Sequence, residues 1–338
     1  MYRLLRSLLF RLDPEVAHQL TLYALRIGGV EPFASLLRSI YSAPQKPVHA
    51  FGLTFKNPVG LAAGYDKDAV AINGLSALGF GHLEIGTVTL KPQPGNPKPR
   101  VFRLPEDNAV INRMGFPGKG AAFVVDKLTR LNVRMFKRTN TILGLNIGKN
   151  KDTLLEEAAD DYIELMKMFS PLADYLTINI SSPNTVGLRR LQGREMLENL
   201  LGQIKLEREN LKVKLPILVK IAPDLSDDEL DDAIGVILDK NMDGIIATNT
   251  TLARDGLRSK HQRETGGLSG SPLTVKSEAI LSRVVKLVNG KVPVVSAGGI
   301  MSPDDAKKRL ALGASLVQVY TGLVYRGPSL VREIVKNL

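Results

Sequence analysis

Amides and hydroxyls gather in residues 179–185, which read Asn-Ile-Ser-Ser-Pro-Asn-Thr and follow the short apolar run at 175–178. This order predicts that a buried strand ends there and that a polar loop begins. An amide side chain both donates and accepts hydrogen bonds, so the loop suits a planar ligand with carbonyl and N–H edges. The chain has no cysteine. A catalytic base in this loop would therefore be an alcohol, and Ser182 is the candidate.

The composition excludes several classes of site. Without cysteine there is no disulfide framework, thiolate zinc site or cysteine nucleophile, and no two of the four histidines have the spacing of a metal-binding pair. We therefore expect no metal. The net charge of +11 predicts an anionic partner, and charge alone leaves nucleic acid, a membrane surface and a phosphorylated ligand open. No apolar run approaches the ~20 residues that span a bilayer, and no signal peptide is recognisable, so we expect the chain to stay where it is made.

The first 42 residues differ from the rest. Five leucines between positions 4 and 12 fall on one arc of a helical wheel, with arginines opposite, which predicts an amphipathic helix. Asp13-Pro14 has the form of an N-cap followed by proline, and Gly28-Gly29 is a stop signal, so a second helix is predicted at 14–27. A third is predicted at 32–41. We predict two regions: an N-terminal amphipathic helical segment at 1–42, and a larger domain at 43–338.

The larger domain alternates between short apolar runs and amphipathic helical stretches. The runs suited to buried strands lie at 59–63, 83–88, 142–147, 175–180, 217–222, 244–248, 292–297 and 316–320, and predicted helices include 152–169, 227–240 and 304–312. Eight strand-then-helix units predict an α/β fold, the parallel (β/α)8 TIM barrel. The competing open, doubly wound sheet usually carries a GxGxxG turn after its first strand, and none is present. Residues 91–116 are too long and proline-rich for a connector and are predicted to form a functional loop.

In such a barrel the chemistry lies at the carboxyl ends of the strands. Small or polar residues occur at all eight of these ends: Ala62 to Lys67, Gly86-Thr87, Asn146, Asn179, Lys220, Thr248-Asn249-Thr250, Gly298-Gly299 and Tyr320-Thr321-Gly322. The glycines after the last two strands, next to a helix that begins near Ser302-Pro303, predict a phosphate cradle. The run at 265–270 either extends this cradle or is a surface loop.

Two lysines at the strand ends are candidates for binding an anionic ligand. A lysine buried in a strand is expensive unless it meets a negative charge, and Lys220 has apolar neighbours on both sides, so we expect it to face a ligand. Lys67 follows Asp66, and it either faces a ligand or forms an ordinary ion pair.

These motifs carry a family resemblance that runs nearly end to end. They are LDPE with AH at 12–18, AAGYDK at 62–67, EIGTV at 84–88, PQPGN at 92–96, INRMGF at 111–116, NIGKN at 146–150, NISSPN at 179–184, VKIAPD at 219–224, ATNTT at 247–251, GGLSG at 266–270 and GASLVQ at 313–318. The chain resembles a class 2, quinone-dependent dihydroorotate dehydrogenase. The resemblance implies that (S)-dihydroorotate is oxidised to orotate in de novo pyrimidine biosynthesis, with electrons passing through one FMN per chain to a membrane quinone.

The resemblance also implies roles for individual residues. Ser182 would be the base that removes the C5 proton while a hydride leaves C6, helped by a neighbouring hydroxyl or a water relay. The residues implied for substrate binding are Lys67, Asn112, Arg113, Met114, Gly115, Phe116, Asn179, Asn184, Asn249 and Thr250. Those implied for FMN are Ala62, Ala63, Gly64, Tyr65, Asp66, Thr87, Asn146, Asn179, Lys220, Thr248, Gly270, Gly298, Tyr320 and Thr321. Pro117-Gly118 stands where the family pattern has Asn-Asn or Asn-Ser, which leaves the hydrogen bonding of this loop open.

The resemblance gives the N-terminal helices a function as well. They would lie on the anionic cytoplasmic surface of the cell inner membrane, as a peripheral anchor, and admit the quinone near His18, Arg103 and Tyr320. The alternatives are that they pack as a cap on the barrel and that His18 serves helix packing. We expect no nucleic acid partner and a monomer.

Other functions fit the sequence less well. Another FMN barrel, such as a dihydrouridine synthase, would explain the basic charge, but those enzymes protonate through a cysteine. The same absence and the N-terminal helices exclude a soluble class 1 dihydroorotate dehydrogenase. A non-catalytic basic barrel that binds an anion predicts that Ser182 is dispensable.

Overall fold

The structure is a computed structural model that describes residues 2–131, 139–212 and 214–338. Within these residues, eight parallel strands close into a barrel in the order β10-β12-β13-β3-β4-β7-β8-β9. The strands are β3 (Val59–Leu61), β4 (His82–Val88), β7 (Ile142–Ile147), β8 (Tyr175–Asn179), β9 (Ile217–Ile221), β10 (Gly244–Ala247), β12 (Val294–Ala297) and β13 (Leu316–Val319). Each lies within a residue or two of its predicted position, so the predicted (β/α)8 barrel is confirmed.

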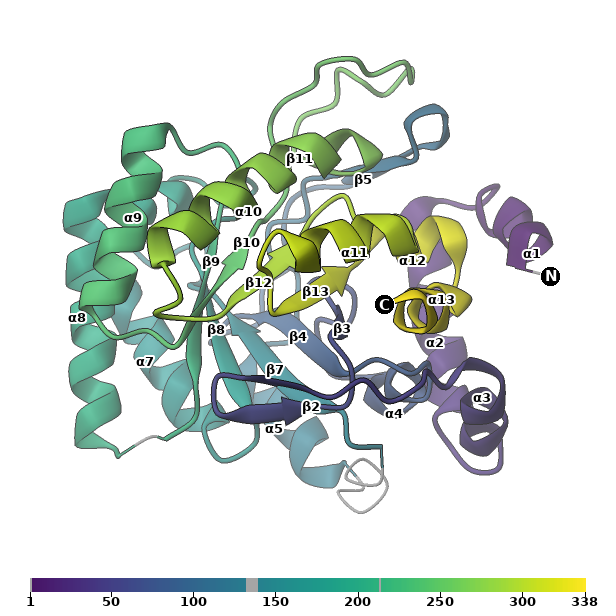
Figure 1. Cartoon of the computed structure of the whole chain (residues 1–338), viewed down its shortest axis with the longest axis horizontal. Helices are drawn as coiled ribbons and strands as arrows, with labels where there is room; N and C mark the ends of the chain where they lie inside the picture. Colours follow the sequence, from purple (N-terminus) through teal and green to yellow (C-terminus); the bar gives the residue numbers. More distant parts are fainter. Residues whose placement is uncertain (1, 132–138, 213) are drawn as a thin grey trace.

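Helices surround the barrel (Figure 1). They are α4 (Ile72–Ser76), α5 (Ala121–Arg130), α7 (Ala158–Phe169), α8 (Arg194–Asn210), α9 (Asp227–Asp239), α10 (Thr274–Val288), α11 (Pro303–Ala311), α12 (Thr321–Arg326) and α13 (Ser329–Asn337). The helix predicted at 152–169 begins only at Ala158. The reason is that Asp161 Oδ2 accepts hydrogen bonds from Asn150 N at 2.7 Å and Thr153 Oγ1 at 2.8 Å, which fold the preceding residues into a loop.

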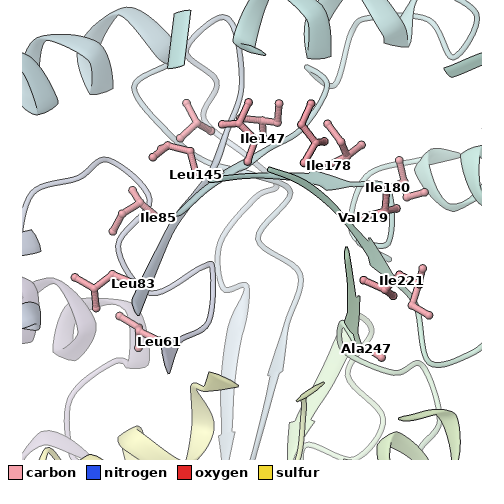
Figure 2. Packing of buried hydrophobic residues seen from close by; sticks show 14 of the residues in the cluster. Leu61, Leu83, Ile85, Leu145, Ile147, Ile178, Ile180, Val219, Ile221 and Ala247 are labelled. Carbon is pink, nitrogen blue, oxygen red and sulfur yellow. The ribbon is translucent and has the colours of Figure 1, made fainter. Parts of the chain in front are cut away.

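Alternation along the strands divides the barrel into an apolar outside and a partly polar inside. Figure 2 shows Leu83 and Ile85, Leu145 and Ile147, and their neighbours on the convex side of the curved sheet, pointing toward the helices. The intervening positions face the barrel axis. Near the amino ends of the strands these inner positions are apolar apart from His82, and Phe55 packs among them. Toward the carboxyl ends they are polar, and they build the site.

Two short antiparallel pieces complete the barrel. The hairpin of β1 (Val48–Ala50) and β2 (Leu53–Phe55) supplies Phe55 to the inner cluster. The segment 91–116, predicted as a loop, contains β5 (Val101–Leu104), a turn at η1 (Pro105–Asp107) and β6 (Ala109–Asn112). β6 pairs with both β5 and β11 (Gly267–Gly270) in a three-stranded sheet, so the glycine-rich run at 265–270 is mostly a strand and the surface-loop alternative is wrong.

Three N-terminal helices lie together on one side of the barrel, near α13 (Figure 1). They are α1 (Tyr2–Leu9), α2 (Pro14–Gly28) and α3 (Phe33–Tyr41). Asp13 caps α2 as predicted, accepting from the backbone N–H groups of Glu15 and Val16. The first helix ends at Leu9 rather than at Leu12, because the Arg103 guanidinium binds the carbonyl oxygens of Leu9 and Leu12.

The α2 helix lies directly against the barrel helix α4. A Cβ on Gly74 would lie 1.9 Å from the carbonyl oxygen of Leu25, and one on Gly29 would lie 2.6 Å from Gly74 N. Only glycine permits this backbone approach. The opposite faces of the N-terminal helices remain uncovered: most of the large apolar side chains exposed in the described residues lie between Leu4 and Ile40.

Candidate active site

A cavity of about 690 Å³ opens at the carboxyl ends of the strands and continues between α1 and α2. Most residues predicted for substrate or cofactor lie on its wall: Ala62, Ala63, Gly64, Tyr65, Lys67, Thr87, Asn112, Met114, Gly115, Phe116, Asn179, Ser182, Asn184, Lys220, Thr248, Asn249, Thr250, Gly270, Gly298, Tyr320 and Thr321. A single large pocket with a few convergent polar groups is the usual form of a small-molecule site.

Ser182 lies on this wall with 5% of its surface exposed. Its Oγ accepts a hydrogen bond from Asn184 N at 3.2 Å, which leaves the hydroxyl proton free to point into the cavity. The Asn184 side chain donates in turn to Asn112 Oδ1 at 3.1 Å, and Asn249 donates to Ser181 Oγ at 3.0 Å. The predicted polar loop therefore meets the ends of β6 and β10 around one space.

Beneath this loop the amides form a chain of hydrogen bonds inside the barrel. Asn179 Nδ2 donates to Thr87 Oγ1 at 2.8 Å and to Asn146 Oδ1 at 3.0 Å, and Thr87 donates to Asn146 Oδ1 at 2.6 Å. Asn146 Nδ2 then donates to Glu84 Oε1 at 2.8 Å. These bonds fix the rotamers of Thr87 and Asn179, the two members that reach the cavity.

Glu84 is the centre of this network, and it was not among the predicted site residues. It is fully buried and accepts hydrogen bonds from Gln318 at 2.8 Å and Tyr175 at 3.2 Å. Lys220 Nζ lies 3.7 Å from Glu84 Oε1 and also lines the cavity, so this lysine faces both a carboxylate and the ligand space. The signal that picked out Lys220, a charge between apolar strand residues, applies equally to Glu84.

Lys67 is not paired with Asp66. Its Nζ donates to the carbonyl oxygen of Gly64 at 2.5 Å, and burial lowers the pKa of Lys67 to about 8. Asp66 instead accepts from the backbone N–H groups of Val70 and Ala71 at the start of α4. Lys67 therefore brings positive charge to the cavity wall beside the loop of Ser182, and the ion-pair alternative is wrong.

Glycines after β12 and β13 form the part of the wall predicted to cradle a phosphate. Gly298 and Gly299 have φ values of 100° and 74°, which favour glycine. At the amino end of α11, the helix predicted beside these glycines, Asp305 accepts a hydrogen bond from Met301 N at 2.9 Å. A further part of the wall comes from α12, where Thr321 Oγ1 lies 2.8 Å from Ser269 Oγ of β11.

Three of the predicted residues lie outside the cavity wall. Asp66 and Asn146 stand behind it, in the contacts described above. Arg113 turns away: its guanidinium binds Glu264 at 2.6 Å and lies over the ring of Phe102, 4.5 Å from the centroid. An aromatic ring and a carboxylate on the neighbouring loop thus hold a side chain whose sequence position alone pointed to the substrate.

Gln93 supplies the hydrogen bonds of the loop with the unusual Pro117-Gly118 pair. Gln93 and Gly118 form a backbone bridge with two bonds of 3.0 Å, and Gln93 Nε2 donates to the carbonyl oxygens of Gly115 and Phe116. The loop therefore keeps its polar groups satisfied without asparagine at these positions.

The outer part of the cavity is apolar and aromatic. It runs between Leu5, Leu9 and Leu20 of the N-terminal helices. The His18 ring meets Tyr65 edge-on at 4.9 Å, Tyr65 meets Tyr320 at 5.7 Å, and burial lowers the pKa of His18 to about 4. A neutral imidazole and two phenols therefore join the apolar entrance to the polar floor.

The residues that the structure describes contain no cluster of histidine, aspartate and glutamate with the geometry of a metal site. None of their helices has the length and apolar character needed to cross a bilayer.

Comparison with known proteins places this site in a family. The family model for dihydroorotate dehydrogenase matches residues 47–338. Proteins named dihydroorotate dehydrogenase (quinone) from Burkholderia thailandensis, Roseiflexus and Escherichia coli O1:K1 are 50%, 47% and 48% identical, across the whole of this chain and 97%, 93% and 99% of theirs. The dihydroorotate dehydrogenase of Eimeria tenella is similar in structure. Its complex with ferulenol has a TM-score of 0.86 and 42% identity, and covers 96% of this chain and 90% of that one. Its ligand-free form has a TM-score of 0.87, 42% identity and coverage of 96% and 94%.

Proposed function

The chain belongs to the dihydroorotate dehydrogenase family, and we infer that it oxidises dihydroorotate to orotate and passes the electrons to a quinone. Full-length identity of 47–50% to relatives named for quinone supports this acceptor. The observation that carries the proposal is the placement of Ser182 and the asparagines around one cavity that continues into an apolar entrance between the N-terminal helices.

We assign the base to Ser182. Oxidation of dihydroorotate removes a proton from C5 and a hydride from C6. The Ser182 Oγ accepts one hydrogen bond from Asn184 N, which leaves a second lone pair to take the C5 proton and leaves its own proton to pass to a neighbouring hydroxyl or a water relay. Burial of the loop excludes water from the reacting atoms, and general-base catalysis by a positioned group contributes about 10²- to 10⁴-fold.

The substrate is a ring with amide edges and one carboxylate. Asn112, Asn184 and Asn249 offer donors and acceptors to the edges, with Thr250 and Asn179 beside them. Lys67 offers the cation for the carboxylate, and an anion at that position would favour its charged form.

The cavity is suited to FMN as the cofactor. Paired glycines with positive φ at Gly298-Gly299, hydroxyls at Ser269 and Thr321, and the Lys220 ammonium offer a phosphate cradle and a cation at the opposite end. FMN, when bound, supplies the hydride acceptor and the electron carrier to the quinone. Lys220 would stabilise negative charge on its pyrimidine edge. The residues assigned to hold it are those of the cavity wall predicted above, with Asn146 and Asp66 supporting from behind.

The decisive experiment is dihydroorotate-dependent reduction of a soluble quinone by the purified protein and by Ser182→Ala. We expect a yellow protein that reduces quinone, and a Ser182→Ala variant with unchanged FMN content and about 10²- to 10⁴-fold lower kcat. A colourless protein would contradict the cofactor. A Ser182→Ala protein as active as the wild type would contradict the base and favour a non-catalytic anion-binding barrel.

We further propose that residues 1–42 form the region that binds an anionic membrane, peripherally and on the cytoplasmic side, while residues 43–338 form the catalytic barrel. Exposed Leu4 and Leu8, with Arg6 and Arg11 nearby, support this placement. The complete cavity within one chain supports action as a monomer.

The double substitution of Leu4→Glu and Leu8→Glu should abolish flotation with anionic lipid vesicles. Leu206→Glu, at a leucine on α8 that is as exposed as Leu8 (60% against 61%), is the control and should leave flotation unchanged. Equal flotation of all three proteins would contradict the assignment.

A further inference from the structure

We propose that Arg189 is a positioning residue that holds Ser182 in place by tying together the loops that follow β8, β9 and β10. The inference rests on the proposed role of Ser182 as the base. Arg189 lies in η2 (Leu188–Gln192), outside the cavity wall, and would act through the backbone of other residues.

The Arg189 guanidinium makes three contacts to three different loops. Its Nε donates to the carbonyl oxygen of Ser181 at 3.0 Å, and its Nη2 donates to the carbonyl oxygen of Thr250 at 2.8 Å. Its Nη1 binds Asp224 Oδ2 at 2.8 Å. The Ser181 carbonyl belongs to the peptide that leads into Ser182, and the Thr250 carbonyl belongs to a residue on the substrate side of the cavity. One planar group therefore sets the distance between the base and part of the substrate wall.

Asp224 supplies the counter-charge and fixes the guanidinium. Besides Arg189, it accepts from Leu252 N at 3.0 Å, from Thr251 Oγ1 and from Lys276 Nζ. Burial alone would raise the pKa of Asp224, but the bonds from Lys276, Thr251 and Arg189 lower it to about 2, so it is a carboxylate throughout the working range of pH. The loop after β10 is thus held twice, once by Arg189 and once by Asp224.

Arginine is the side chain that this arrangement requires. Its fork presents N–H groups in three fixed directions, whereas a lysine brings one nitrogen on a flexible stem and cannot reach the three acceptors in this geometry. A misplacement of about 1 Å at a reacting group can lower a rate by about 10²-fold. Arg189→Lys should therefore leave the charge but release the peptide before Ser182.

The test compares Arg189→Lys with Arg194→Lys in flavin-loaded enzyme. Arg194 is the matched control, because it is also ion-paired to an aspartate (Asp232, 2.7 Å), but its side chain is exposed and its bonds run to Asp232 and Glu198 on α9 and α8 rather than to the loops of the site. We expect Arg189→Lys to lower kcat by about 10- to 100-fold, with KM changing less than about threefold. We expect Arg194→Lys to match the wild type.

A second readout separates positioning of the base from general loss of structure. With dihydroorotate deuterated at C5, the isotope effect on kcat should rise in Arg189→Lys, because the misplaced base makes proton removal slower relative to the other steps. An unchanged kcat, or a lower kcat with the wild-type C5 isotope effect, would overturn the inference.

Two further variants, Lys276→Met and Ser182→Ala, complete the test. If Arg189→Lys fails to fold, Lys276→Met is used instead, because it removes a partly exposed partner of Asp224 and should change kcat and the isotope effect in the same direction by less. A kcat and an isotope effect equal to those of the wild type would then contradict the positioning role of Arg189. Ser182→Ala run in the same series separates the two proposals. A fully active Ser182→Ala protein would contradict the proposed function. An inactive Ser182→Ala together with a wild-type kcat in Arg189→Lys would contradict only the role of Arg189.

Discussion

Replacing Lys220 by methionine should destabilise the barrel itself, apart from any effect on catalysis. Lys220 Nζ and Glu84 Oε1 lie 3.7 Å apart, and their side chains are 6% and 0% exposed. At an effective dielectric constant of about 20, two unit charges at this distance attract by about 4.5 kcal/mol. Removing one partner of a buried pair typically costs about 3–5 kcal/mol, because the other charge stays buried without compensation. We expect Lys220→Met to lower the free energy of unfolding by this amount.

A double-mutant cycle isolates the interaction. Glu84→Gln keeps the shape of Glu84 and much of its hydrogen bonding to Asn146, Tyr175 and Gln318 while removing the charge. The double variant has neither charge, so its loss of stability should be smaller than the sum of the single losses by about 3–4 kcal/mol.

The assay is urea unfolding of the four proteins, each with and without added FMN. Bound cofactor raises apparent stability by mass action, so the two conditions separate its contribution from that of the ion pair. Single losses that add within about 0.5 kcal/mol would refute the reasoning, since residues that do not interact are additive within that range. The pair would then be screened well beyond what its burial implies.

Three further predictions concern protons and backbone packing. Burial lowers the pKa of His82 to about 3, below the 6.5 of the unfolded chain. The unfolded state therefore binds a proton at a higher pH than the folded state does. The contribution of His82 to the free energy of unfolding should be full above pH 6.5 and fall by up to about 1.4 kcal/mol per pH unit below it. His82→Gln should flatten the plot of Tm against pH, and an equally steep plot would count against this. Burial lowers the pKa of Lys67 to about 8, so the Kd for orotate, followed by flavin absorbance, should be constant below pH 7 and weaken about tenfold per pH unit well above 8; a constant Kd up to pH 9.5 would exclude Lys67 as the carboxylate ligand. Gly74→Ala would place Cβ 1.9 Å from the Leu25 carbonyl oxygen, so it should lower the free energy of unfolding by at least about 1–3 kcal/mol and speed proteolysis of the N-terminal helices. Gly235→Ala in α9, with open space around it, should be neutral or stabilising. Equal Tm values for the two variants would show that α2 is free to shift.

Much of the fold could be predicted because its signals are local. Each barrel strand is a short apolar run, and the cap at Asp13 lies next to the helix it begins. The polar strand ends could be predicted as one site because parallel strands in a closed barrel end at the same edge. That rule brought Asn179, Lys220 and Asn249 together without any knowledge of their contacts.

The failures come from pairings between distant parts of the chain. The strand at 267–270 exists because it pairs with β6, with Gly267 opposite Asn112, and its glycine-rich sequence has low strand propensity by itself. A Cβ on Gly267 would lie 2.0 Å from Thr250 Oγ1, so at this position glycine permits the strand to approach Thr250 closely. The orientation of the Arg113 side chain could not be predicted either, because its partner Glu264 belongs to a loop that only the folded chain brings near.

The two lysines of the site acquire different roles from their partners in the folded chain. Lys220 faces Glu84, so its charge is balanced within the barrel before any ligand arrives. Lys67 donates to the neutral carbonyl of Gly64, and Asp68, Asp66 and Glu15 act on its charge without forming an ion pair with it. A buried charge seeks a counter-ion, so the substrate carboxylate should be drawn to Lys67 rather than to Lys220. We therefore predict the orientation of the substrate in the cavity: its carboxylate at the β3 end of the site, and its ring toward the asparagines and Ser182.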